Sequence, residues 1–112
     1  MADVVKFLLG ALANLRLIHW QTKSYARHVA SDALISELSA LTDTFVEAHM
    51  GRHGPPTVSG SIELLDRVDA PKYVKSVRDK LVTFKIEEPD LLSVRDDMLV
   101  VLNKTLYLFT LK

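Results

Sequence analysis

The chain contains no cysteine, which excludes a disulfide framework, a thiolate metal site and a cysteine nucleophile. It also has no excess charge, because 14 Lys and Arg residues balance 14 Asp and Glu residues. No overall electric field attracts DNA, RNA or an anionic membrane, so we expect neither nucleic acid nor membrane as a partner. Lack of cysteine is typical of a reducing compartment, and we predict a cytoplasmic protein that binds any metal through nitrogen and oxygen atoms.

The sequence lacks a hydrophobic run suited to a signal peptide or a membrane span. Residues 7–13 are apolar, but Asp3 precedes them and the amphipathic pattern continues to Trp20, as in a helix. Residues 98–111 are strongly apolar, yet polar residues at 103–105 interrupt them and the stretch is too short for a bilayer. We predict that both stretches are helices of a globular domain.

What the sequence does contain is the composition of one globular domain spanning residues 1–112. Hydrophobic residues make up 48% and charged residues 25%, which is enough apolar material for a single core. Apolar side chains recur at steps of three and four, which predicts helices over about residues 4–22, 25–50, 73–84 and 89–111. Ser24 is the expected N-cap of the second helix and Gly51 its expected end.

The segment of residues 52–70 is rich in glycine and proline, including Gly54, Pro55, Pro56 and Gly60. Such a composition predicts a long connection, with room for one helical turn at residues 62–65. Four helices with one long connection in the middle match the arrangement of ferritin-like bundles. The expected fold is therefore all-α, a ferritin-like four-helix up-down bundle with one crossover connection.

One side of the second helix carries a polar stripe. At about 100° per residue, its members share roughly a quarter of the helix surface; they are His28, Asp32, Ser36, Ser39, Asp43 and Glu47. Steps of four residues place His28 beside Asp32, and Asp43 beside Glu47. The two pairs lie roughly 28 Å apart from His28 to Glu47, at a rise of 1.5 Å per residue. One helix cannot bring both pairs to one ion.

An antiparallel copy of the same helix can bring the pairs together. Both pairs are centred midway between Glu37 and Leu38, so a two-fold axis there sets His28 and Asp32 of one chain against Glu47 and Asp43 of the other. Two equivalent metal sites would form in a homodimer. On the first helix, His19 lies on the apolar face, where an unpaired imidazole would be costly and needs a partner.

These residues resemble the Dps-type mini-ferritins of the ferritin-like superfamily. The chain reads His19-Trp20, then His28-x3-Asp32, then Asp43-x3-Glu47, and the resemblance covers residues 15–51. It implies a ferroxidase centre in which His19, His28 and Asp32 come from one subunit and Asp43 and Glu47 from its neighbour, with Trp20 beside the site. Imidazole and carboxylate ligands suit iron, manganese or zinc, and the resemblance favours iron.

The resemblance implies a homo-oligomer, a dimer at minimum, with a larger cage left open. It implies iron(II) oxidation by oxygen or peroxide, with no catalytic residues beyond the metal ligands. The alternative is a non-catalytic homodimeric bundle whose polar stripe is a structural interface or a structural metal site. The chain has no Lys-rich tail of the kind that binds DNA. We interpret His49 and His53, on either side of Gly51, as capping or surface residues.

Overall fold

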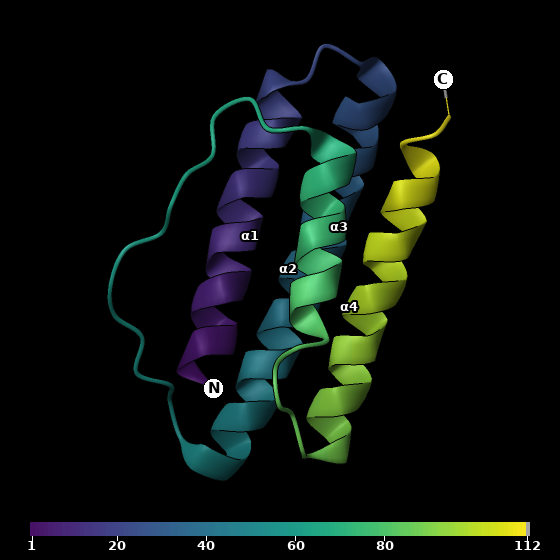
Figure 1. The fold of residues 1–112 in the computed structure, drawn as a ribbon. Helices are drawn as coiled ribbons and strands as arrows, with labels where there is room; N and C mark the ends of the chain where they lie inside the picture. The colour runs from purple at the N-terminus through teal and green to yellow at the C-terminus, as the bar shows by residue number, and fades with distance from the viewer. Residues whose placement is uncertain (112) are drawn as a thin grey trace.

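The computed structural model describes residues 1–111, and within that range all regular structure is helical. The four helices are α1 (Ala2–Gln21), α2 (Tyr25–His53), α3 (Ala70–Leu81) and α4 (Pro89–Leu108), as Figure 1 shows. An all-α four-helix bundle is therefore confirmed. Among these four helices, none combines the length and the hydropathy needed to cross a bilayer.

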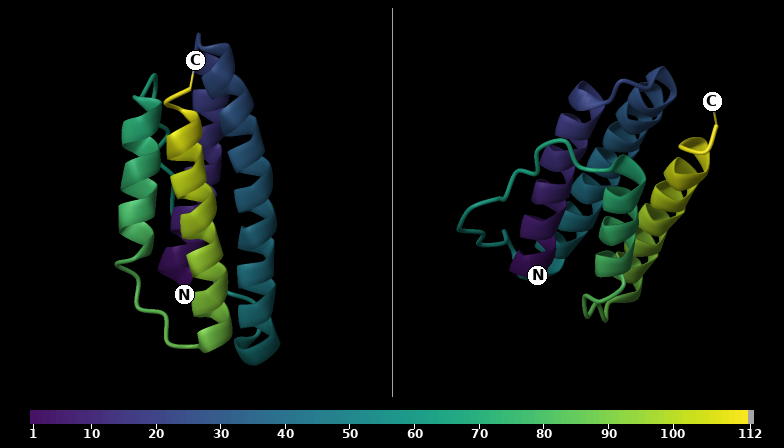
Figure 2. Two further views of the ribbon diagram at one scale, coloured as in Figure 1. Left: turned by 90° about the vertical axis from the view of Figure 1, so that its right-hand side faces the viewer. Right: turned by 45° about the horizontal axis from the view of Figure 1, so that its top comes forward.

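The bundle consists of two helical hairpins, α1–α2 and α3–α4, joined by one long connection that runs the length of the bundle. α1 and α2 are antiparallel, and so are α3 and α4 (Figure 1). The connection of residues 54–69 travels along the outside of α1, which makes α3 run in the same direction as α2 (Figures 1 and 2). α2 packs against both α1 and α4, and α3 packs mainly against α4. The long connection expected from the glycines and prolines is present.

All four helices contribute to one hydrophobic core. The largest fully buried apolar side chains are Leu8 and Leu15 of α1, Leu34, Leu38 and Phe45 of α2, Val74, Val77 and Leu81 of α3, and Leu91, Met98 and Leu102 of α4. Burying each such side chain contributes about 1.5–3 kcal/mol. The core face of α2 thus faces α1 and α4, and its polar stripe remains on the outside.

Two helices begin at side-chain caps that satisfy their first backbone amides. The Ser24 hydroxyl accepts a hydrogen bond from the Arg27 amide at 3.2 Å, which confirms Ser24 as the N-cap of α2. The Asp69 carboxylate accepts one from the Lys72 amide at 3.0 Å, and α3 begins directly after it. The predicted start at residue 73 was therefore three residues late, because Pro71 fits the first turn of a helix.

Other predicted boundaries were also wrong. α2 does not end at Gly51 but continues to His53, and Gly54, with φ of 77°, ends it. Residues 62–65 form no helical turn, because the Asn14 side chain binds the backbone of this stretch in an open conformation. α3 ends at Leu81 instead of residue 84, and α4 ends at Leu108 instead of residue 111.

Candidate metal centre

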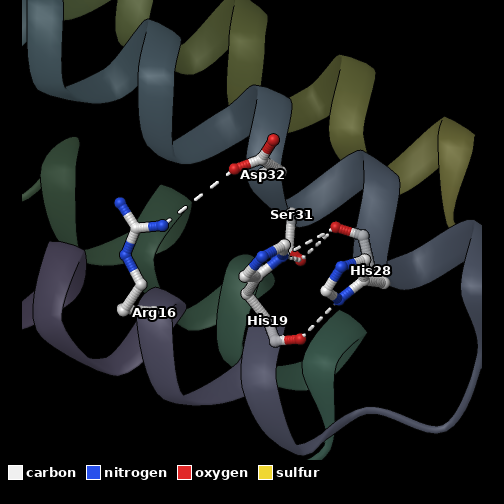
Figure 3. Close-up of polar contacts among 5 residues, drawn as sticks. All are labelled: Arg16, His19, His28, Ser31 and Asp32. Atoms are coloured by element: carbon white, nitrogen blue, oxygen red, sulfur yellow. Dashed lines mark hydrogen bonds and ion pairs between the residues drawn. The ribbon is translucent and has the colours of Figure 1, made fainter.

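His19 and His28 meet where α1 turns into α2. The turn between the two helices spans only residues 22–24, so the last turn of α1 lies against the first turn of α2. The two imidazole rings stack with centroids 3.9 Å apart and planes 17° from parallel (Figure 3). The Nδ1 atom of each ring lies 2.8 Å from the backbone carbonyl oxygen of the other residue. Each histidine thus binds the backbone of the other, and this clasp holds the end of α1 against the start of α2.

These hydrogen bonds fix the tautomer of both rings. A carbonyl oxygen can only accept, so each Nδ1 carries the proton and donates it. In a neutral ring the Nε2 atom then holds the free lone pair, which is the form that binds metal. Histidine ligands in metal sites usually donate their other ring N–H in this manner. The free nitrogen of each neutral ring is therefore Nε2, the atom through which a metal ion would bind these histidines.

Ser31 completes the buried side of this pair. Its hydroxyl lies 3.2 Å from His19 Nδ1 and donates to the His28 carbonyl oxygen at 3.0 Å. Ser31 is fully buried and His19 is 9% exposed, whereas His28 is exposed. His19 was expected to need a polar partner in its apolar surroundings. The His28 carbonyl oxygen and the Ser31 hydroxyl are its partners.

Asp32 lies one turn further along α2 than His28, its side chain is exposed, and it faces Arg16 (Figure 3). Its carboxylate is 4.0 Å from Nη1 of Arg16, which comes from α1. Both side chains are substantially exposed, so this ion pair adds little stability. Arg16 nevertheless places a positive charge beside Asp32, the carboxylate that a metal ion would bind.

Asp43 and Glu47 lie exposed in the second half of α2, away from the histidines. They follow Asp32 by 11 and 15 residues, or roughly 16 and 22 Å along the helix axis. Among residues 1–111, no three His, Asp or Glu side chains already surround a common metal position. A single chain thus gathers His19 and His28, places Asp32 nearby, and leaves Asp43 and Glu47 apart.

The outer face of α2 is hollowed between the separated ligands. A groove of about 550 Å³ is lined by Arg16, Asp32, Ile35, Ser36, Ser39, Ala40 and Asp43. Its middle consists of the small, exposed residues Ser36, Ser39 and Ala40, and an acid lies towards each end. Small side chains leave room for another helix to approach this face.

Trp20, the expected neighbour of the centre, is 67% exposed at the end of α1. Its place beside a metal stays a prediction, since a second chain would be needed to cover it. Our sequence analysis missed Ser31 and Arg16. Both could have been found from spacing, because Ser31 follows His28 by three residues and Arg16 precedes His19 by three, so each shares a helix face with its histidine.

Comparisons with known proteins give a family. The sequence model of DUF5856, described as a family of unknown function, matches residues 19–109. A protein of Enterobacteria phage T4, described as an uncharacterized 14.6 kDa protein in the mobD-ri intergenic region, is 32% identical over 114 aligned residues, which cover 98% of this chain and 88% of the phage protein. No solved structure matches the chain significantly. By the extent of these two matches, the chain belongs to the DUF5856 family.

Proposed function

We propose that this protein binds iron(II) in a site shared across a homodimer of α2 and oxidises it with oxygen or peroxide. The observation that carries the proposal is the reciprocal pairing of His19 and His28, in which both Nδ1 atoms donate to backbone carbonyls at 2.8 Å. This pairing leaves the Nε2 lone pair of each neutral ring free for a metal ion, which is the arrangement that histidine ligands in metal sites usually have.

The course of the chain supports a ferritin-like assignment. α2 and α3 run in the same direction because the connection between them travels along the bundle (Figure 1). A single long crossover between two antiparallel hairpins is the topology of ferritin-like bundles. In those bundles the carboxylate and imidazole ligands project into the bundle core. Here Asp32, Asp43 and Glu47 are exposed on the outer face of α2, so a second copy is needed to enclose the site.

The missing ligands come from a second copy in this proposal. An antiparallel α2 packed on the groove, with the two-fold axis between Glu37 and Leu38, brings Asp43 and Glu47 of the second copy towards Asp32 and the histidine pair. Ser36, Ser39 and Ala40 lie at the axis and are exposed, so they permit close contact of the helices. The same operation creates the site twice.

The residues of the chain bind the iron ion and neutralise its charge, and the iron supplies the redox chemistry. The imidazoles of His19 and His28 offer neutral nitrogen ligands, and the clasp between α1 and α2 keeps their rings from turning. The carboxylates of Asp32, Asp43 and Glu47 balance the positive charge of the ion. In the chain without metal, Arg16 partly neutralises Asp32, and it must move away from that carboxylate when an ion binds.

A second candidate is a non-catalytic homodimer. The reciprocal hydrogen bonds and the Arg16–Asp32 pair partner three of the predicted ligands without any metal. In that case the polar stripe of α2 is only an interface, or holds a structural metal ion. The two candidates differ in one measurable property, the oxidation of iron(II).

The decisive experiment compares aerobic iron(II) oxidation by the wild type, Asp32→Asn and Asp43→Asn. Both acids are exposed, so the variants should fold, and both should lose most of the activity. Without metal they should form dimers at least as tight as the wild type, because the converging carboxylates repel one another. Asp97→Asn, an exposed acid on α4, is the matched control. If both site variants oxidise iron(II) at the wild-type rate, or if the wild type does not oxidise it, the proposal fails and the non-catalytic homodimer is the function that remains.

A further inference from the structure

A second group of metal-ligating side chains lies at the opposite end of α2 from His28. Since α2 continues through Gly51, His49 and His53 occupy the same helix face at a spacing of four residues. Their ring centroids are 4.7 Å apart. The Nε2 atom of His53 lies 3.2 Å from Oε1 of Glu88, the residue that precedes α4.

His49 has an unused ring nitrogen. Its Nδ1 atom is buried and has no hydrogen-bond partner among the described residues. Nearly all buried polar side-chain atoms have a partner, so an orphaned imidazole nitrogen requires an explanation. No existing hydrogen bond of this atom has to be broken for it to bind a ligand.

We propose that His49, His53 and Glu88 bind one zinc ion within a single chain and so tie the end of α2 to the start of α4. Two imidazoles and one carboxylate, with water in the fourth position, are an established zinc ligand set. Calcium and magnesium are disfavoured, because they require more oxygen ligands than this group offers.

The spacing of His53 and Glu88 suits this ion. Two ligand atoms, each about 2.1 Å from a tetrahedral zinc ion, lie about 3.4 Å apart, and the observed N–O separation is 3.2 Å. His49 joins by rotating its side chain, since the three groups do not yet surround one point. Histidines four residues apart on one helix can bind the same zinc ion.

Burial, His53 and the N-terminal ammonium lower the pKa of His49, whereas the Glu88 carboxylate raises it, so charges of both signs lie near this group. Arg52, the nearest arginine along the chain, is held by Asp90 in an ion pair of 2.8 Å. Arg52 thus pairs with Asp90, and the side-chain partner of Glu88 is His53. This zinc site shares no ligand with the centre at His19 and needs no second copy, so the two proposals stand or fall separately.

The test measures zinc chloride binding by calorimetry and equilibrium dialysis. All proteins carry Asp32→Asn, which disables the proposed dimer site. We expect one zinc ion per chain and a melting temperature that rises with zinc. His53→Ala and Glu88→Gln should weaken zinc binding at least tenfold, whereas His28→Ala should leave it unchanged. Melting temperatures without zinc show whether each variant is folded.

Three results would overturn the proposal. One is the absence of zinc uptake by the Asp32→Asn protein at 100-fold excess over the chain. Another is unchanged zinc affinity in folded His53→Ala. The third is loss of zinc binding in His28→Ala together with its retention in His53→Ala, which would assign the ion to the other end of α2.

Discussion

At the scale of single residues, Asn14 is the side chain that holds the crossing segment against α1. It is 4% exposed, and its amide group donates to the carbonyl of Glu63 at 3.0 Å and accepts from the amide of Leu65 at 2.8 Å. Asn14→Ala leaves both backbone groups unpaired, which should lower the free energy of unfolding by about 1–3 kcal/mol. Urea unfolding measures this loss.

Asn103→Ala is the matched control, because Asn103 is exposed and bonded to Arg78 on the surface of the bundle. Its effect should stay within about 0.5 kcal/mol. Equal losses in the two variants would contradict the role of Asn14. The importance of Asn14 could have been inferred from the sequence, since a polar residue interrupts the apolar face of α1 between Ala11 and Ile18.

Tyr73 gives a prediction for alkaline pH. Burial raises the pKa of Tyr73 above its ordinary value of 10.0, while a hydrogen bond with Asn14 acts in the opposite direction. A raised folded-state pKa gives stability that is complete below the unfolded pKa and is lost as the pH rises through the folded pKa. The wild type should therefore lose stability more steeply above about pH 10 than Tyr73→Phe.

Urea midpoints between pH 7 and 11 test this expectation for Tyr73. Tyr107→Phe is the control, because the Tyr107 side chain is 61% exposed. Parallel curves for the wild type and Tyr73→Phe over the whole range would show that the phenol of Tyr73 is not coupled to folding.

At the scale of elements, two nearby glycines of α2 should respond in opposite directions to one substitution. Gly51 is helical and a Cβ added to it meets nothing within 4 Å, so Gly51→Ala should stabilise the protein by up to about 1 kcal/mol. Gly54 has φ of 77° and ψ of −178°, a region almost confined to glycine. Gly54→Ala should destabilise by about 1–3 kcal/mol.

Thermal unfolding of the two glycine variants checks the end of α2 directly. If Gly51→Ala destabilised the protein and Gly54→Ala did not, α2 would end at Gly51, and His53 would not share a helix face with His49. The same measurement therefore bears on the zinc site.

The elements show where sequence reasoning succeeds and why it fails. Apolar periodicity gave all four helices, since each buries one face in a common core. Their ends were less predictable, because a glycine such as Gly51 ends a helix only when the backbone takes a positive φ. The candidate site was predictable in part. The spacing of the stripe on α2 is visible in the sequence, but the stacking of His19 on His28 depends on the geometry of the turn at residues 22–24.

At the scale of the whole molecule, the α2 groove predicts how the chain associates. Ala40→Arg places a long cation in the middle of the proposed interface, whereas Ser93→Arg places it on an exposed position of α4. Sedimentation in the presence of iron should show Ala40→Arg at the single-chain mass of 12.6 kDa and Ser93→Arg at twice that mass. A wild type that stays at 12.6 kDa with iron would remove the shared site.

Residues 54–69 lie on the outside of α1, so the two hairpins that they join can associate without a continuous connection (Figure 1). Much of this segment is exposed, and the side chains of Asn14 and Gln21 on α1 form hydrogen bonds with it. The core between the two hairpins is formed by α2 and α4 instead. A protease that cuts at Val58 would therefore leave the α1–α2 and α3–α4 fragments associated through this core. The same two fragments, produced as separate polypeptides, should bind each other and form the bundle.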